Sequence, residues 1–259
     1  MPRKELRPCI VLLVRRESAD TVLSLPLLID RVGFINGGPS PEFSGILVPT
    51  AHNYQFPYQE VTPCCALTNT SGTSIGSSVQ YNAGSLFAAL ETGDTVRNTI
   101  ENSPLWFELH PVLGGSNPRC SGAFTNACPD LASVEVRQED CFVCGGWANG
   151  GSADLAALQP DADNNLTMVF TFTSFSDQPG VAYTSRRVDY PSSLMNGAGA
   201  YLAVSESGNS DGWHTNSATA LDLTDPKNPG IWFSSTYQPT VQSPWIFQIG
   251  ELGFAAPNQ

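Results

Sequence analysis

The segment TMVFTFTS, residues 167–174, carries the clearest strand pattern in the chain. Met168, Phe170 and Phe172 alternate with threonine and valine, so one face is built of large apolar side chains. This period of two is the pattern of a half-buried β-strand. The segment therefore predicts an aromatic strand with one face directed toward a core.

Turn-forming residues stand on both sides of this strand. PDADNN (160–165) precedes it, SDQPG (176–180) follows it, and VAYTSRR (181–187) has the pattern of the next strand. Asp, Asn, Pro and Gly favour turns because they adopt left-handed backbone, fix φ or bond to their own backbone. The order of turn, aromatic strand and further strand recurs in SSVQYNAGSLFAALET (77–92) and SATALDLTDPKNPGIWFSSTYQ (217–238).

Phe87, Phe170 and Phe233 occupy equivalent positions in these repeats. Repeats of short antiparallel strands with an aromatic face are typical of β-propeller blades, which bury their faces by stacking on neighbours. We therefore predict one all-β domain over residues 1–259, a β-propeller of several four-stranded blades whose N-terminal part is incomplete. A Cys-rich insertion loop is expected at about 114–150. A β-sandwich is the alternative, although it gives no reason for the repeated order.

The composition restricts the classes of partner. Twelve basic residues stand against 24 acidic ones, giving a formal net charge of −12. An acidic surface repels phosphate backbones and anionic lipids, so we expect neither nucleic-acid binding nor membrane insertion. No apolar run approaches the length needed to span a bilayer.

The seven cysteines are many for a protein of a reducing compartment. Cys120, Cys128, Cys141 and Cys144 fall in one loop-rich region and are the disulfide candidates. Four thiolates could also bind zinc, but the C-x-x-C formed by Cys141 and Cys144 has no second pair at matching spacing. We therefore expect at least one disulfide, no metal, and an extracellular or cell-surface location, even though no signal peptide is visible.

The C-terminal third resembles a known family. GWHTNSATALDLTDP (212–226), IWFSSTYQ (231–238) and WIFQIGELGF (245–254) resemble the closing blade of bacterial secreted sialidase-like (BNR-type) β-propellers of mostly unassigned activity. The likeness extends over about residues 60–256 and implies a secreted or surface propeller. It departs from the family at His214, Thr215 and Asn216, which replace a Gly-Asp-Tyr, and the repeated Asp-box of true sialidases is absent.

Sialidase-like hydrolysis is an alternative function with little support in these residues. It needs several arginines that grip one substrate carboxylate together. Arg186 and Arg187 are adjacent in a predicted strand, so they point to opposite faces. The segment DADNN (161–165) has calcium-loop spacing at first, but Leu166 stands where such a loop needs glycine. We expect no catalytic residues and no cofactor.

Two tryptophans are the best ligand-binding candidates. Trp147 lies in GGWANGGS, and Trp213 lies in SGNSDGWHTN beside His214, which is the third ligand-binding candidate. An indole in such polar, glycine-rich loops is unexpected unless a ligand or a neighbouring element covers it. We predict a non-catalytic extracellular or surface β-propeller that binds a glycan or a protein through loops on one face. A structural subunit of a surface assembly is the second alternative.

Overall fold

The protein is all-β in the part of the chain that the structure describes. The structure is a computed structural model that describes residues 22–29, 42–49, 60–61, 67–68, 79–96, 99–114, 130–142, 151–174, 176–188, 195, 200–206, 217–224, 230–240 and 242–253. Every regular element among these residues is a β-strand, which confirms the predicted all-β class. Within the same ranges there is no helix that could cross a membrane.

The chain forms two compact units. The first comprises residues 1–53 and 111–135, and the second comprises residues 54–110 and 136–259. In the first unit, strands β1 (Val22–Ile29) and β2 (Glu42–Pro49) pair antiparallel along their whole length.

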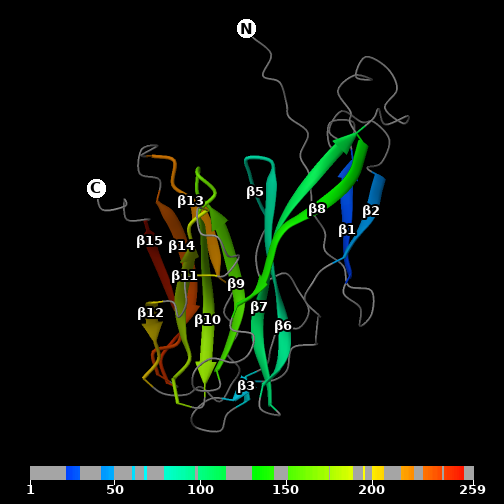
Figure 1. The fold of residues 1–259 in the computed structure, drawn as a ribbon. Coiled ribbons are helices and arrows are strands. Elements are labelled where there is room, and N and C mark those ends of the chain that lie inside the picture. The colour runs from blue at the N-terminus through cyan, green and yellow to red at the C-terminus, as the bar shows by residue number, and fades with distance from the viewer. Residues whose placement is uncertain are drawn as a thin grey trace. The chain divides into compact units, whose positions relative to one another are not determined.

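Three antiparallel sheets are built mainly from residues of the second unit, and in each the strand order follows the chain (Figure 1). Sheet I contains β5 (Gln80–Asn82), β6 (Ser85–Val96), β7 (Thr99–Gly114) and β8 (Asp130–Cys141). Sheet II contains β9 (Gly151–Pro160), β10 (Leu166–Ser174), β11 (Gly180–Arg186) and β12 (Ala200–Val204). Sheet III contains β13 (Ala218–Leu221), β14 (Ile231–Tyr237) and β15 (Ile246–Leu252), while β3 (Glu60–Val61) and β4 (Leu67–Thr68) form a short separate pair.

The predicted turns lie where the sequence places them. Asp161 begins the β9–β10 turn: its Oδ1 accepts hydrogen bonds from the backbone N–H groups of Asp163 and Asn165, each at 2.9 Å. In the β10–β11 turn the Oγ of Ser174 donates to Asp177 Oδ2 at 2.8 Å and accepts from the Asp177 N–H at 2.7 Å. These side-chain bonds replace ladder bonds that the backbone loses where it reverses.

The β5–β6 hairpin has a two-residue turn. Asn82 pairs with Ser85, and the residues between them, Ala83 and Gly84, have φ angles of 44° and 89°. Positive φ at both central positions is the requirement of a type I′ turn, which matches the twist of the flanking strands. The turn closes at the cost of placing an alanine in left-handed backbone.

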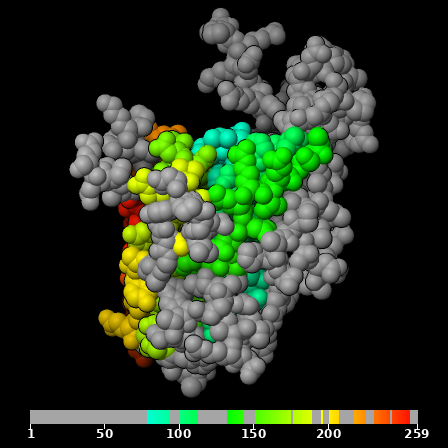
Figure 2. All heavy atoms as spheres, in the orientation of Figure 1, coloured from blue at the N-terminus to red at the C-terminus, as the bar shows by residue number. Residues whose placement is uncertain are grey.

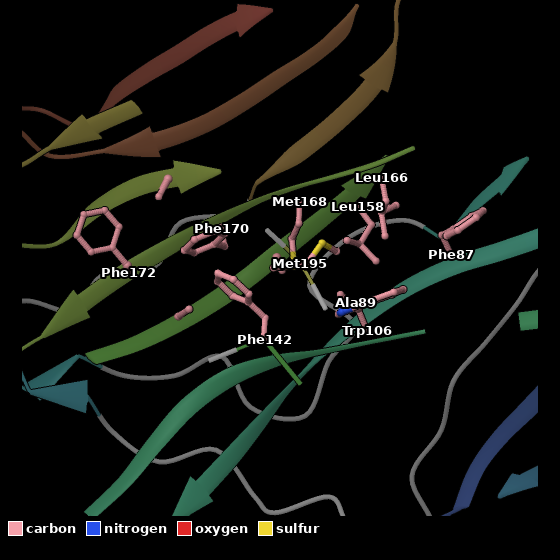
Figure 3. Packing of buried hydrophobic residues seen from close by; sticks show 13 residues of the cluster. Phe87, Ala89, Trp106, Phe142, Leu158, Leu166, Met168, Phe170, Phe172 and Met195 are labelled. Carbon is pink, nitrogen blue, oxygen red and sulfur yellow. The ribbon is translucent and has the colours of Figure 1, made fainter. Parts of the chain in front are cut away.

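Strands β9 and β10 of sheet II are buried on both faces, whereas β12 at the edge of this sheet is exposed or half-buried. Toward sheet I, Phe170 packs with Phe142 at a ring-centroid distance of 5.0 Å, in a cluster that includes Phe87 and Trp106 (Figure 3). Toward sheet III, Val169 and Val181 pack with Phe233. All residues of β9 and β10 are accordingly buried.

The predicted alternation of faces in residues 167–174 is present, because Met168, Phe170 and Phe172 pack in one cluster and Val169 in another. The prediction of a half-buried strand is wrong, because a sheet covers each face of β10.

The three repeated phenylalanines lie on the second strand of their sheets, as the repeat predicts. Phe170 and Phe233 each face the preceding sheet, whereas Phe87 faces the following one. Successive side chains of a strand alternate between faces, so a shift of one residue between repeats reverses the direction of a side chain. Phe87 therefore lies on the same strand of its sheet as the other two phenylalanines, but its side chain points to the opposite face of the sheet.

The range 114–150, predicted as a Cys-rich loop, contains β8. This strand is the fourth of sheet I and lies at its edge. In Figure 2, β8 (green) and β12 (golden yellow), the outer strands of sheets I and II, lie at the surface.

Candidate functional site

Two carboxyl groups meet in the interior between sheets I and II. Glu91 of β6 is 3% exposed and Asp154 of β9 is 7% exposed. Asp154 lies at a β-bulge, where the β9–β10 register shifts and the next residue, Leu155, has φ of 50°. Bulges bend a strand and redirect its side chains, and here the Asp154 carboxyl lies close enough to Glu91 to shift its pKa.

This contact changes the ionisation of Glu91. Burial disfavours its charged form, and the nearby Asp154 carboxyl adds repulsion and a hydrogen bond, so the pKa of Glu91 rises to about 11. Glu91 is therefore protonated at neutral pH. Both groups lie between two sheets with almost no exposed surface, which suits a structural link better than proton transfer to a substrate.

A buried arginine makes a second polar link between the same sheets. The guanidinium carbon of Arg186, in β11, lies over the ring of Trp106, in β7, at 5.9 Å from its centroid. Both side chains are fully buried. Burial lowers the pKa of Arg186, and the nearby Glu108 carboxylate opposes that shift.

Glu108 connects this buried pair with the surface. Its Oε1 accepts a hydrogen bond from Ser85 Oγ at 2.8 Å and lies 3.8 Å from Nη1 of the partly exposed Arg137. The same Arg137 nitrogen donates to Ser85 Oγ at 3.2 Å. Arg137, Glu108 and Arg186 thus form a chain of alternating charges at the Trp-Phe-Glu segment of β7.

The turns of sheets I and II are bonded to each other. Asn82 Nδ2, at the β5–β6 turn, donates to the Asp161 carbonyl at 2.7 Å and to Asn164 Oδ1 at 2.6 Å. Asn165 Oδ1 accepts from the Val188 N–H at 3.0 Å. The DADNN segment is therefore a hairpin turn whose polar side chains hold neighbouring backbone. Within the described residues there is no group of three metal-ligating side chains.

Sheet III exposes an apolar face. Ile231 and Phe233 of β14 are buried toward sheet II, whereas Trp232 between them is 42% exposed. Cross-strand pairing places Ala220 beside Trp232, Ile249 beside Ser234, and Phe247 beside Thr236. We call the face formed by these residues together with Ala218 the outer face of sheet III; on it Phe247 and Ile249 are 71% and 68% exposed.

The margin of this face is acidic. Trp232 Nε1 donates to Asp222 Oδ2 at 2.9 Å. Hydrogen bonds from the backbone and side chain of Thr224, together with the one from Trp232, hold the pKa of Asp222 below its ordinary value. Glu251 is exposed and pairs across the strands with Trp232.

The ligand-binding candidates Trp147, Trp213 and His214 lie outside the described residues. So do Cys120, Cys128 and Cys144. Cys141 is buried at the end of β8 and is disulfide-bonded. Because the other six cysteines lie outside the described residues, a bond within the set Cys120, Cys128, Cys141 and Cys144 stays a prediction.

The Glu91–Asp154 pair and the outer face of sheet III were not predicted from the sequence. Each nevertheless has a recognisable pattern in the sequence. Glu91 stands in register with the buried Phe87 and Ala89, and a carboxylate in a core register indicates an unusual environment. In IWFSSTYQ (231–238), Trp232 and Phe233 are adjacent and must face opposite sides of one strand. A sheet with large apolar side chains on both faces is expected to pack against other protein on both faces.

Comparison with known proteins finds no matching family model, no matching curated protein and no matching solved structure. The described residues contain three antiparallel sheets of 4, 4 and 3 strands, with sheet II packed against residues of sheets I and III, and two shorter strand pairs.

Proposed function

We propose that this protein is a non-catalytic extracellular or cell-surface protein of the β-propeller type that binds a glycan or a protein partner through loops. The sequential strand order of sheets I, II and III supports the propeller, because a propeller blade is an antiparallel sheet of about four strands in chain order. A β-sandwich has two sheets, whereas three are packed in series here.

The observation that carries the proposal is the place of the two tryptophans in this order. Trp147 lies between β8 and β9, and Trp213 lies between β12 and β13. Each connection links the fourth strand of one sheet to the first strand of the next. Both contain a Gly-Trp pair shortly before that first strand, namely Gly146-Trp147 and Gly212-Trp213. Topologically equivalent loops of a propeller lie on the same face, where both indoles and His214 could bind one ligand.

The ionisable groups of the described residues support binding over hydrolysis. A glycosidase needs an acid and a nucleophile that both reach the scissile bond. Glu91 and Asp154 are enclosed between sheets, and Arg186 stacks on Trp106 in the core. None of these three side chains is placed to grip a substrate from solution, so sialidase-like hydrolysis is the weaker alternative.

The test combines a glycan-array screen of the full chain with a fluorogenic sialoside assay. We expect glycan binding without turnover. Trp147→Ala and Trp213→Ala should each weaken binding about 2- to 10-fold, the effect of losing one aromatic stacking contact. Trp232→Ala is the matched control, because this tryptophan is exposed on a sheet face rather than in those loops.

Two outcomes decide against this proposal. Sialoside turnover that is lost in Arg187→Ala, with the fold intact, would establish an enzyme. Absence of both turnover and glycan binding would favour the structural subunit of an assembly, which the exposed outer face of sheet III independently supports.

A further inference from the structure

The two connections that carry Trp147 and Trp213 join sheet II at the same end. The first enters at the start of β9, and the second leaves at the end of β12. The first residue of β9 pairs with Ser174, which ends β10, and the last residue of β12 pairs with Gly180, which starts β11. The β10–β11 turn therefore lies at this end too, where the arrows of β10 and β12 finish in Figure 1. We call this end, with the turn of residues 174–180, the loop edge of sheet II.

Tyr201 and Asp177 lie together at the loop edge. The Tyr201 ring, from β12, stacks on Phe172 with 4.7 Å between the ring centroids and 24° between the planes, yet the residue is 53% exposed. Burial and then repulsion by the nearby Asp177 carboxylate raise the pKa of Tyr201. Ser174 Oγ and Ser176 Oγ donate to Asp177 Oδ2 at 2.8 and 3.3 Å. The ring is thus held against a core residue with much of its surface exposed, beside a carboxylate that the turn fixes in place.

This pair has the chemistry of a sugar subsite. An aromatic ring can stack on the apolar C–H face of a sugar, and tyrosine offers such a surface at a small entropic cost because its side chain has two rotatable bonds. A carboxylate accepts strong hydrogen bonds from hydroxyl groups.

The charge of the loop edge restricts the kind of sugar. Besides Asp177 it carries the exposed Glu206, whose backbone N–H donates to the Pro239 carbonyl at 2.6 Å. Two carboxylates in a chain of net charge −12 repel an anionic ligand. The loop edge therefore favours an uncharged sugar over one that bears a carboxylate.

We propose that Tyr201 and Asp177 form a subsite for a neutral sugar, on the same edge of sheet II as the connections with Trp147 and Trp213. Tyr201 stacks on one sugar ring, and Asp177 accepts hydrogen bonds from its hydroxyl groups. The inference rests on the proposed glycan-binding function and narrows its ligand to an uncharged oligosaccharide.

The experiment is a glycan array probed with the full chain, on which each neutral oligosaccharide stands beside its sialylated form. We expect the neutral forms to bind more strongly. Tyr201→Ala should weaken binding about 2- to 10-fold, whereas Tyr201→Phe, which keeps the ring, should retain most of it. Asp177→Asn should weaken binding of the neutral forms about 10-fold or more, because it removes hydrogen bonds to a charged group. It should also reduce the preference for neutral over sialylated glycans.

Tyr81→Ala is the matched control. Tyr81, in β5, is 65% exposed, and its neighbour Asn82 bonds to Asp161 and Asn164 of the β9–β10 turn, at the opposite end of sheet II. This variant should bind glycans like the parent chain. Circular dichroism and thermal unfolding must show that all four variants fold like the parent.

The outcomes separate this subsite from the proposed function. If the parent chain binds no glycan, the proposed function fails and the subsite fails with it. If Trp147→Ala or Trp213→Ala weakens glycan binding while Tyr201→Ala and Asp177→Asn do not, the subsite alone is overturned. Binding confined to sialylated glycans, or an equal loss in Tyr81→Ala, overturns it as well.

Discussion

Arg186 lies over the ring of Trp106 with 5.9 Å between the guanidinium carbon and the ring centroid, inside the core between two sheets. The two residues come from β11 and β7, so the contact joins sheet II to sheet I. A desolvated guanidinium over an indole is attracted by the ring quadrupole, with about 2 kcal/mol available at buried sites.

Arg186→Ala should destabilise the fold by about 2 to 4 kcal/mol, because it removes a buried cation near Glu108 and leaves a cavity against Trp106. Arg187→Ala, at the half-buried neighbouring position, should cost less than about 1 kcal/mol. Denaturant unfolding of both variants checks this difference. In a double-mutant cycle with Trp106→Leu we expect a coupling of about 0.5 to 2 kcal/mol. Equal losses in the two arginine variants would contradict the buried role of Arg186.

The Glu91–Asp154 contact predicts a pH-dependent stability. Glu91 holds its proton in the folded chain up to a pKa of about 11, whereas its ordinary value is 4.5. The folded state thus binds more protons than the unfolded state between these values, and stability falls as pH rises through that window. The slope from one such group is at most about 1.4 kcal/mol per pH unit.

Glu91→Gln keeps the shape of the side chain and removes its titration. We expect the free energy of unfolding of this variant to vary less between pH 5 and pH 9 than that of the parent chain, with the variant relatively more stable at the alkaline end. Urea unfolding at several pH values measures this free energy of unfolding. Glu206→Gln, at an exposed position, is the control. Superimposable pH profiles for the parent and Glu91→Gln would refute the assignment.

The alanine in the β5–β6 turn is suboptimal. Ala83 is exposed and has φ of 44°, a conformation that asparagine adopts more readily. Ala83→Asn should raise stability by about 0.5 to 1 kcal/mol, since Asn-Gly is a preferred type I′ pair. Ala83→Val should lower it, because a β-branched side chain is strained at positive φ. Thermal unfolding of both variants tests the turn; a stabilising valine would show that this backbone conformation is not maintained.

Cys141 is disulfide-bonded, and we expect its partner to be Cys120, Cys128 or Cys144. Peptide mapping without reductant identifies the pair. Reduction should lower stability by on the order of 3 kcal/mol, the entropy that a closed loop of this kind removes from the unfolded chain. Free thiols at Cys120, Cys128, Cys141 and Cys144, or one zinc ion per chain, would contradict the predicted disulfide.

The sequence by itself determined the local elements. The alternation in residues 167–174 gave β10, and the turn residues of PDADNN and SDQPG placed its two ends. Strands and turns of this kind depend on the backbone preferences of single residues and on alternation with a period of two. Both can be recognised within a short segment of sequence. The repeated order also indicated sheets built in sequence, which sheets I to III bear out.

Only the tertiary structure decided which side chains meet and which faces are covered. Glu91 and Asp154, like Trp106 and Arg186, come from strands of different sheets, and no spacing along the chain predicts their contact. The same holds for Phe87, whose strand was predictable but whose face was not, because a shift of one residue reverses it. Trp106 and Trp232 stand in similar Trp-Phe pairs, yet one is buried and the other exposed, since burial depends on whether another sheet covers the face.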